Sequence, residues 1–165
     1  LNLARLEDAN FSGANLREAT MFQPIFGNTI FSGANLSSAR VIGTLGKVDM
    51  SSAQVIDGQF GLDVGNQPMG QMKFDSSGGD FSKTNFERAD LNIASFIFGN
   101  LREANLRHTN LYRAELIQAD LTGADLTGAD LTDANVDGAN FNNVKGLETV
   151  KGFNTVKGKC KNCGM

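Results

Sequence analysis

The stretch Ala-Asp-Leu-Thr-Gly-Ala-Asp-Leu-Thr-Gly-Ala-Asp, residues 119–130, repeats a five-residue unit and begins a third one without a change. The same period runs from Phe81 to Phe141, where thirteen consecutive fifth residues are Leu, Phe or Val. Ala lies two residues before nine of these positions, and Asn or Asp lies one residue before eleven of them. A period of five matches neither an α-helix nor a flat strand. It predicts a solenoid of stacked units.

A longer period of twenty residues is superimposed on the first. The N-terminal part keeps the five-residue frame, and its hexapeptide Phe-Ser-Gly-Ala-Asn-Leu at residues 11–16 recurs at residues 31–36. Four units therefore return the chain to the same side. This spacing predicts a square coil with one unit per side, in which like residues stack on like residues.

The unit Ala-(Asp/Asn)-Leu-x-x resembles the repeat of the pentapeptide-repeat proteins, and the resemblance covers most of residues 1–141. It implies an all-β solenoid, namely a right-handed quadrilateral β-helix with four repeats per coil. In that fold the small residue and the central Leu or Phe point inward, and the other three residues face solvent. At a strand spacing of ~4.8 Å, about seven coils would form a rod ~35 Å long.

The segment 42–80 departs from this frame and allows two interpretations. In one, residues 61–80 form a Gly-rich excursion. In the other, which we favour, the helix continues but slips twice through four-residue sides. Apolar residues keep a spacing of five after each slip: Leu45, Met50, Val55 and Phe60 after the first, and Val64, Met69 and Phe74 after the second. The residues from Asp75 to Asp80 then indicate a short protruding loop.

The outward Asn and Asp residues are expected to stack in columns that keep carboxylates apart. The predicted columns are Asp80–Asn100–Asp120–Asn140, Asn85–Asn105–Asp125 and Asp90–Asn110–Asp130. Like charges directly opposite each other on adjacent strands are destabilising. Alternation with Asn therefore favours the stack.

After Phe141 the apolar period changes to three, with Val144, Leu147, Val150, Phe153 and Val156. This pattern suits short helical or 3-10 turns. A solenoid also needs a cap over its exposed core and strand edges. We therefore expect a β-helix over residues 1–143 and a helical cap with a Cys-containing tail over residues 144–165, its lysines forming either a solvated end or a partner-docking rim.

Cys160 and Cys163 form the one Cys-x-x-Cys of the chain. A zinc site would need two further ligands, and a thioredoxin-like redox pair would need a strand and a following helix. A structural disulfide is favoured if the compartment is oxidising. Unpaired thiols remain the other possibility.

Composition argues against several classes of protein. The chain has 165 residues and a net charge of −3, which suits one domain with a core and gives no basic face for nucleic acid. No stretch approaches the ~20 apolar residues that span a bilayer. His108 is isolated, and no motif indicates a catalytic, cofactor-binding or metal-binding residue. Because Leu1 lies inside the repeat, we expect a processed product without its targeting segment.

The leading hypothesis is a non-enzymatic structural or protein-interaction module with an unidentified protein partner. Within the family, the chain looks most like members associated with the chloroplast thylakoid lumen or the cyanobacterial lumen or periplasm, because of its single domain, expected helical cap and candidate terminal disulfide. The alternative is a DNA mimic that binds and protects a type II topoisomerase, as the fluoroquinolone-resistance members do. That function requires a strongly acidic rod, which a net charge of −3 does not provide. Any specific activity is expected where the period fails, at 42–80 and after 141.

Overall fold

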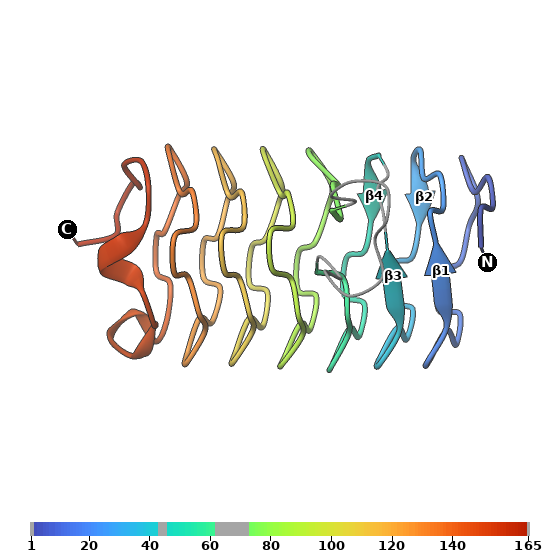
Figure 1. Ribbon diagram of the computed structural model, residues 1–165, viewed down its shortest axis with the longest axis horizontal. Coiled ribbons are helices and arrows are strands. Elements are labelled where there is room, and N and C mark those ends of the chain that lie inside the picture. Colours follow the sequence, from blue (N-terminus) through green and yellow to red (C-terminus); the bar gives the residue numbers. More distant parts are fainter. Residues whose placement is uncertain (1, 43–45, 62–72, 165) are drawn as a thin grey trace, which may run out of the picture.

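The computed structural model describes residues 2–42, 46–61 and 73–164, which form a rod of stacked coils with the two chain ends at its opposite ends (Figure 1). Its strands are β1 (Thr20–Phe22), β2 (Thr29–Ile30), β3 (Arg40–Ile42) and β4 (Val48–Asp49). Strand β1 pairs with β3 and β2 pairs with β4, both in parallel. Along the rest of the described chain, single parallel bridges link one coil to the next.

Each unit bridges to its neighbouring coils and then turns a corner. The Leu101 N–H donates to the Asp120 carbonyl of the next coil (2.8 Å), and the Asp120 N–H donates back to the Gly99 carbonyl (2.9 Å). Glu103 then adopts φ 57°, and the Ala104 N–H closes the turn on the Leu101 carbonyl (3.2 Å). One bridge and one left-handed corner account for the period of five.

The core consists of the residues that the period predicts. All thirteen positions from Phe81 to Phe141 are at most 1% exposed, which confirms that they point inward. Burial of one such side chain contributes about 1.5–3 kcal/mol. Where Thr replaces the small residue, its hydroxyl donates to a carbonyl of the preceding coil: Thr84 to Met50 (2.6 Å) and Thr109 to Phe86 (3.0 Å). Polar residues are therefore accommodated without unpaired groups.

The three predicted Asn/Asp columns are confirmed by bridges between residues twenty apart. The Asn100 amide donates to the Asp80 carboxylate (3.0 Å), and the Asn110 amide donates to Asp90 (2.9 Å). Asn thus adds a hydrogen bond between coils, besides separating carboxylates. Within each unit the same side chain accepts the N–H two residues later, as Asp125 does from Thr127 (3.0 Å). This bond is an Asx-turn and explains why Asn and Asp occupy the position.

The pKa of Asp120 lies below the ordinary value of 3.8. Partial burial raises this pKa, but hydrogen bonds from Thr122 and the charge and hydrogen bond of Arg102 outweigh burial. Asp125 has a lowered pKa for the same reasons, one unit later. A carboxylate whose pKa is depressed by folding stabilises the folded protein at pH values above its pKa in the unfolded chain. This stabilisation is lost as the pH falls through its pKa in the folded protein.

We therefore expect the double variant Asp120→Asn/Asp125→Asn to lose less thermal stability on acidification than the parent. Asn keeps an oxygen acceptor for the turn but has no proton to gain. The measurement is Tm between neutral pH and a pH below the ordinary aspartate value. Parallel Tm curves for parent and variant would contradict the assignment of acid sensitivity to these two groups.

The middle of the chain confirms one predicted slip and refutes the other. Ile30 bridges Asp49, nineteen residues later, so one side of that coil is shortened as expected. Asp49 then bridges Asp80, thirty-one residues later instead of twenty. Eleven additional residues are therefore inserted between Gly61 and Lys73, and a second slip is wrong. Leu45, Val64 and Met69, which were assigned to the slipped frame, lie outside the described residues.

The predicted protruding loop from Asp75 to Asp80 is also wrong. Asp75 bridges Ser95 and Asp80 bridges Asn100, as in any other unit. Ser76, fully buried, holds the central position, while Phe74, at 2% exposed, holds the small-residue position. Because the large and the small residue are exchanged between these two positions, the five-residue pattern does not identify this regular unit.

Deletion of residues 62–72 is expected to leave the rod folded. The joined sequence Phe60-Gly61-Lys73-Phe74-Asp75-Ser76 places Ser76 five residues after Phe60 and restores the frame. The entropy of closing a connection depends only weakly on its length, so we expect Tm within a few degrees of the parent. Deletion of the eleven residues 111–121 is the control, because it breaks the frame. Unfolding of both variants would contradict the assigned register.

The tail continues the stack with enlarged sides. Lys145, Lys151, Lys157 and Lys161 bridge Asp125, Asp130, Asn135 and Asn140, respectively. Two 3-10 helices lie between these bridges, η1 (Leu147–Thr149) and η2 (Phe153–Thr155). The apolar period of three therefore describes a last coil that has two six-residue sides and lies over the end of the core.

Candidate functional site

Five outward residues interrupt an otherwise polar surface. Between Lys73 and Asn140, every outward position is polar or Gly except Ile93, Ile97, Phe98, Tyr112 and Ile117, which we call the Phe98 patch. These residues lie on two adjacent coils, because the Ile93 N–H donates to the Tyr112 carbonyl (2.8 Å) and the Phe98 N–H donates to the Ile117 carbonyl (2.9 Å). Phe98 is 68% exposed and Tyr112 is 39% exposed.

Two members of the Phe98 patch occupy left-handed corners. Ile93 has φ 59° and Phe98 has φ 57°. A β-branched residue is a rare outlier in this conformation, which costs about 1–3 kcal/mol. Gly occupies the corresponding corner in several units, for example at Gly123 and Gly128. Phe98 thus exposes an aromatic ring, and Ile93 presents a half-buried β-branched side chain, at corners that Gly occupies in other units.

A shallow groove of about 230 Å³ borders the Phe98 patch, lined by Ile93, Arg113, Glu115, Asp133, Asn135 and Lys157. At its edge Lys73 and Glu115 form a half-buried ion pair (2.5 Å).

Arg113, in contrast, forms no ion pair with any residue that the structure describes. Arg88, Arg102 and Arg107 are paired with Asp57, Asp120 and Asp125 at 2.7, 3.0 and 3.2 Å. The guanidinium beside the Phe98 patch therefore remains available to a bound molecule.

The chemistry of this region suits binding. Over the described ranges 2–42, 46–61 and 73–164, no group of three or more His, Cys, Asp or Glu side chains is placed to hold a metal ion. His108 is exposed at a corner of the unit that precedes the Tyr112 unit. What the patch offers a ligand is apolar contact area with a free Arg113 at its edge.

Ile93→Gly is expected to raise stability while weakening any binding at the Phe98 patch. Gly adopts the left-handed corner without steric cost, so we expect a gain of about 1 kcal/mol. The measurement is the urea midpoint at an unchanged m-value. Gly123→Ile is the reciprocal control, because it places the same side chain at a corner on another side of the rod and should lower stability. A midpoint that falls for Ile93→Gly would show that Ile93 packs favourably and is not strained.

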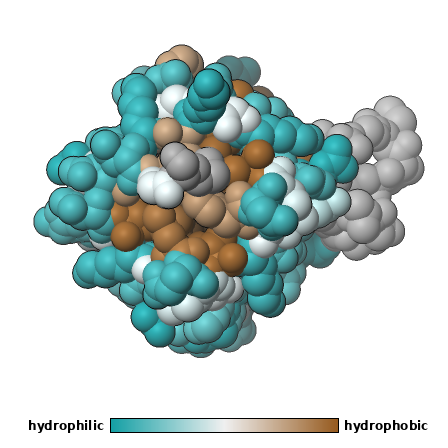
Figure 2. Space-filling view, turned by 90° about the vertical axis from the view of Figure 1, so that its left-hand side faces the viewer, coloured by the Kyte–Doolittle hydropathy of each residue, from teal (hydrophilic) through white to brown (hydrophobic). Residues whose placement is uncertain are grey.

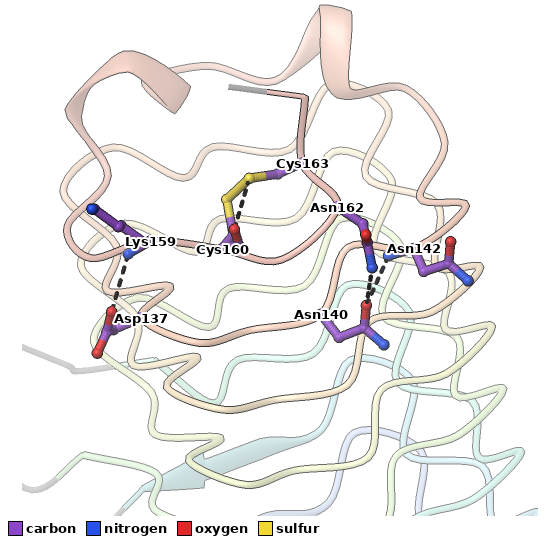
Figure 3. Close-up of a disulfide and its surroundings, with 7 residues drawn as sticks. All are labelled: Asp137, Asn140, Asn142, Lys159, Cys160, Asn162 and Cys163. Carbon is purple, nitrogen blue, oxygen red and sulfur yellow. Dashed lines mark hydrogen bonds between the residues drawn. A yellow bond between two sulfur atoms is a disulfide. The ribbon is translucent and has the colours of Figure 1, made fainter.

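The two predicted cysteines meet in the last coil (Figure 3). The Sγ atoms of Cys160 and Cys163 lie at bonding distance, 2.03 Å. Between them, the Lys161 N–H donates to the Ala139 carbonyl (2.7 Å), and its carbonyl accepts from Phe141 (2.9 Å). The pair therefore encloses the final bridge of the stack and can hold it in place.

The sequence patterns of known families agree with this architecture. The Pentapeptide repeats family matches residues 1–37, 77–108 and 109–145, with eight copies. The unmatched interval contains the shortened side and the insertion. A comparison with curated proteins gave no match. No helix in the described part of the chain is long and apolar enough to cross a membrane.

Solved structures with a similar fold include a trypsin-treated R167E form of QnrB1, a plasmid-mediated fluoroquinolone resistance protein. It is 19% identical at a TM-score of 0.55, covering 98% of this chain and 81% of that one. A pentapeptide repeat protein from the Arabidopsis thaliana thylakoid lumen is 23% identical at a TM-score of 0.29, covering 79% and 67% of the two chains. The likeness to QnrB1 supports the β-helical fold alone.

Proposed function

The chain belongs to the pentapeptide-repeat family, and we propose that it is a non-enzymatic interaction module that binds a protein partner through the Phe98 patch. Members of this family are generally structural or interaction modules. The observation that carries the proposal is the five apolar side chains that lie close together on the otherwise polar surface between Lys73 and Asn140. Contiguous apolar patches on a polar surface mark interaction sites. Tyr and Arg are also enriched among the interface residues that contribute most of the binding energy.

The proposal is tested by affinity capture from the native compartment with the parent, Ile117→Asp and Ser82→Asp. Both substitutions place a carboxylate at the same outward position of a unit, beside Glu115 and Asp80 respectively. We expect a partner that the parent and Ser82→Asp retain and that Ile117→Asp loses at least about tenfold, because a central contact contributes roughly 2 kcal/mol or more. Equal retention by both variants would overturn the proposal.

The architecture that we infer for this module is a right-handed quadrilateral β-helix of about seven coils over residues 1–143, closed by residues 144–165. The parallel bridges at intervals near twenty residues support the four-sided coil. Leu147 and Phe153 of the two 3-10 turns pack against the core, and the tail continues the bridging. Both observations support the closing role of residues 144–165.

We further propose that the module works in an oxidising compartment, either the chloroplast thylakoid lumen or the cyanobacterial lumen or periplasm. The support is the paired geometry of Cys160 and Cys163, because disulfides persist in such compartments. Thiol titration of unfolded, unreduced protein from its native source should find no free thiol. Two free thiols would exclude the disulfide and remove this support.

A DNA mimic that protects a type II topoisomerase is the second candidate, supported by the fold likeness to QnrB1. Two features disfavour it. From Asp80 onward no bridge joins two carboxylates, and the last coil carries lysines. A gyrase supercoiling assay with and without quinolone separates the two functions. Protection at stoichiometric protein would favour the mimic over the interaction module.

A further inference from the structure

The C-terminal end of the rod carries an apolar centre with a cationic rim. Figure 2, a view onto this end, shows hydrophobic residues gathered in the middle and hydrophilic residues around them. The apolar residues are Val144, Leu147, Val150, Phe153 and Val156, which pack on the core but remain half-buried. We call them the terminal patch. Equivalent residues one coil earlier, such as Leu131 and Val136, are fully buried. Among the described residues, the terminal patch is therefore less covered than the inner coils, as are Phe11 and Leu16 at the opposite end of the rod.

Five lysines surround the terminal patch. Lys145, Lys151, Lys157 and Lys161 each end one of the four bridge ladders, and Lys159 lies between two of them. All five are exposed. None forms an ion pair with a residue in the described ranges. Glu148 is the single acidic residue after Phe141. Asp125 and Asp130, the bridge partners of Lys145 and Lys151, lie one coil further from this end.

A second copy of the chain does not fit this surface. A two-fold contact between two C-terminal ends would bring one lysine ring against the other. Like charges that face each other across an interface oppose association. The complementary surface must therefore be anionic around a region that accepts apolar side chains.

A nucleic acid does not fit it either. Proteins that hold single strands offer exposed aromatic rings for stacking, but Phe153 packs against Phe141 with ring centroids 6.0 Å apart. The lysine ring contains no arginine for bidentate contacts. Five lysines around aliphatic side chains instead match the interface of an anionic bilayer, where lysines reach phosphates and apolar side chains enter between head groups.

We propose that the lysine ring and terminal patch dock the rod, end-on, on an anionic lipid bilayer. The contact is peripheral, because it uses one coil end and no membrane-spanning element. It leaves the Phe98 patch, on the side of the rod, free for a protein partner. The two surfaces are independent, and loss of one does not require loss of the other.

The test is cosedimentation of the whole chain with vesicles of phosphatidylcholine containing about 30 mol % phosphatidylglycerol, compared with pure phosphatidylcholine. We expect at least about tenfold stronger partitioning to the anionic vesicles. Raising the salt from about 0.05 M to about 0.5 M should remove most of this binding.

Lys151→Glu/Lys157→Glu should lower the partitioning at least about tenfold, because each lysine near an anionic surface contributes separately. Lys47→Glu/Lys83→Glu makes the same change of charge away from this end and should leave the partitioning near that of the parent. Tm measurements establish that both variants are folded.

Three outcomes would overturn the proposal. The parent fails to bind the anionic vesicles, or both double variants lose binding equally, which would mean attraction by overall charge alone. Alternatively, sedimentation velocity shows a dimer whose contact at this end is strengthened by Lys151→Glu/Lys157→Glu, which would make the end an interface between copies. Specific loss in the first double variant alone supports end-on docking.

Discussion

Leu116→Asp is expected to abolish cooperative unfolding, because the variant has no stable native state at 25 °C. Leu116 is fully buried, and its burial contributes about 1.5–3 kcal/mol. A carboxylate at this position has no partner in the core, and burying an unpaired polar or charged group costs several kcal/mol more. The combined loss approaches the whole stability of a typical domain, roughly 5–15 kcal/mol. Thermal unfolding followed by circular dichroism measures it.

Gln118→Asp is the matched control for Leu116→Asp. Gln118 lies two residues later at an exposed left-handed corner, φ 56°, a conformation in which Asp is tolerated. We expect its Tm to remain within a few degrees of the parent. If Leu116→Asp melts as late as Gln118→Asp, residue 116 does not point into the core.

Phe74→Ala is expected to have the second largest effect, a loss of about 3–5 kcal/mol. Its ring packs against Phe60 (5.2 Å between centroids), Phe96 (5.9 Å) and Phe81 (6.4 Å). These rings fill the core where the chain returns from the insertion, so truncation leaves a cavity. At roughly 2–4 °C per kcal/mol for a chain of this size, Tm should fall by about 6–20 °C.

Phe98→Ala is the control for Phe74→Ala, since it makes the same change at a side chain that is 68% exposed. We expect it to change Tm by no more than a few degrees. It should instead weaken binding of the protein partner. A large loss of Tm for Phe98→Ala would mean that Phe98 packs on the rod and is not part of a binding surface.

The core could be predicted from the sequence because one period assigns every inward residue from Phe81 to Phe141. The insertion was misjudged for a physical reason. Val64, Met69 and Phe74 are spaced by five, which indicates a slipped coil, but Phe74 occupies the small-residue position two residues before Ser76. Ser76 occupies the position expected for a large residue, and Phe74 occupies the position expected for a small one. The sequence pattern therefore indicates a loop at residues 75–80, where the chain forms a regular unit. The pairings of Asp49 with Asp80, Gln54 with Asn85 and Gln59 with Asp90 establish the register.

The candidate site was missed although its signal is in the sequence. Once the inward residues are assigned, Ile93, Ile97, Phe98 and Ile117 stand out as apolar residues at outward positions. Their proximity, however, depends on which coils are adjacent and on which side of the coil each lies. The lysine ring was likewise visible as a basic tail, but only the bridges of Lys145, Lys151, Lys157 and Lys161 show that it encircles one end.

The central claim, that a protein partner binds the side of the rod at the Phe98 patch, is tested most directly by site-specific photo-crosslinking in the native compartment. p-Benzoylphenylalanine at position 98 replaces one exposed aromatic side chain with another, and the same group at Glu103 occupies an equivalent corner, φ 57°, outside the patch. We expect a discrete adduct with one protein from position 98 and none from position 103. Equal adducts from both positions, or an adduct from position 103 alone, would contradict the claim.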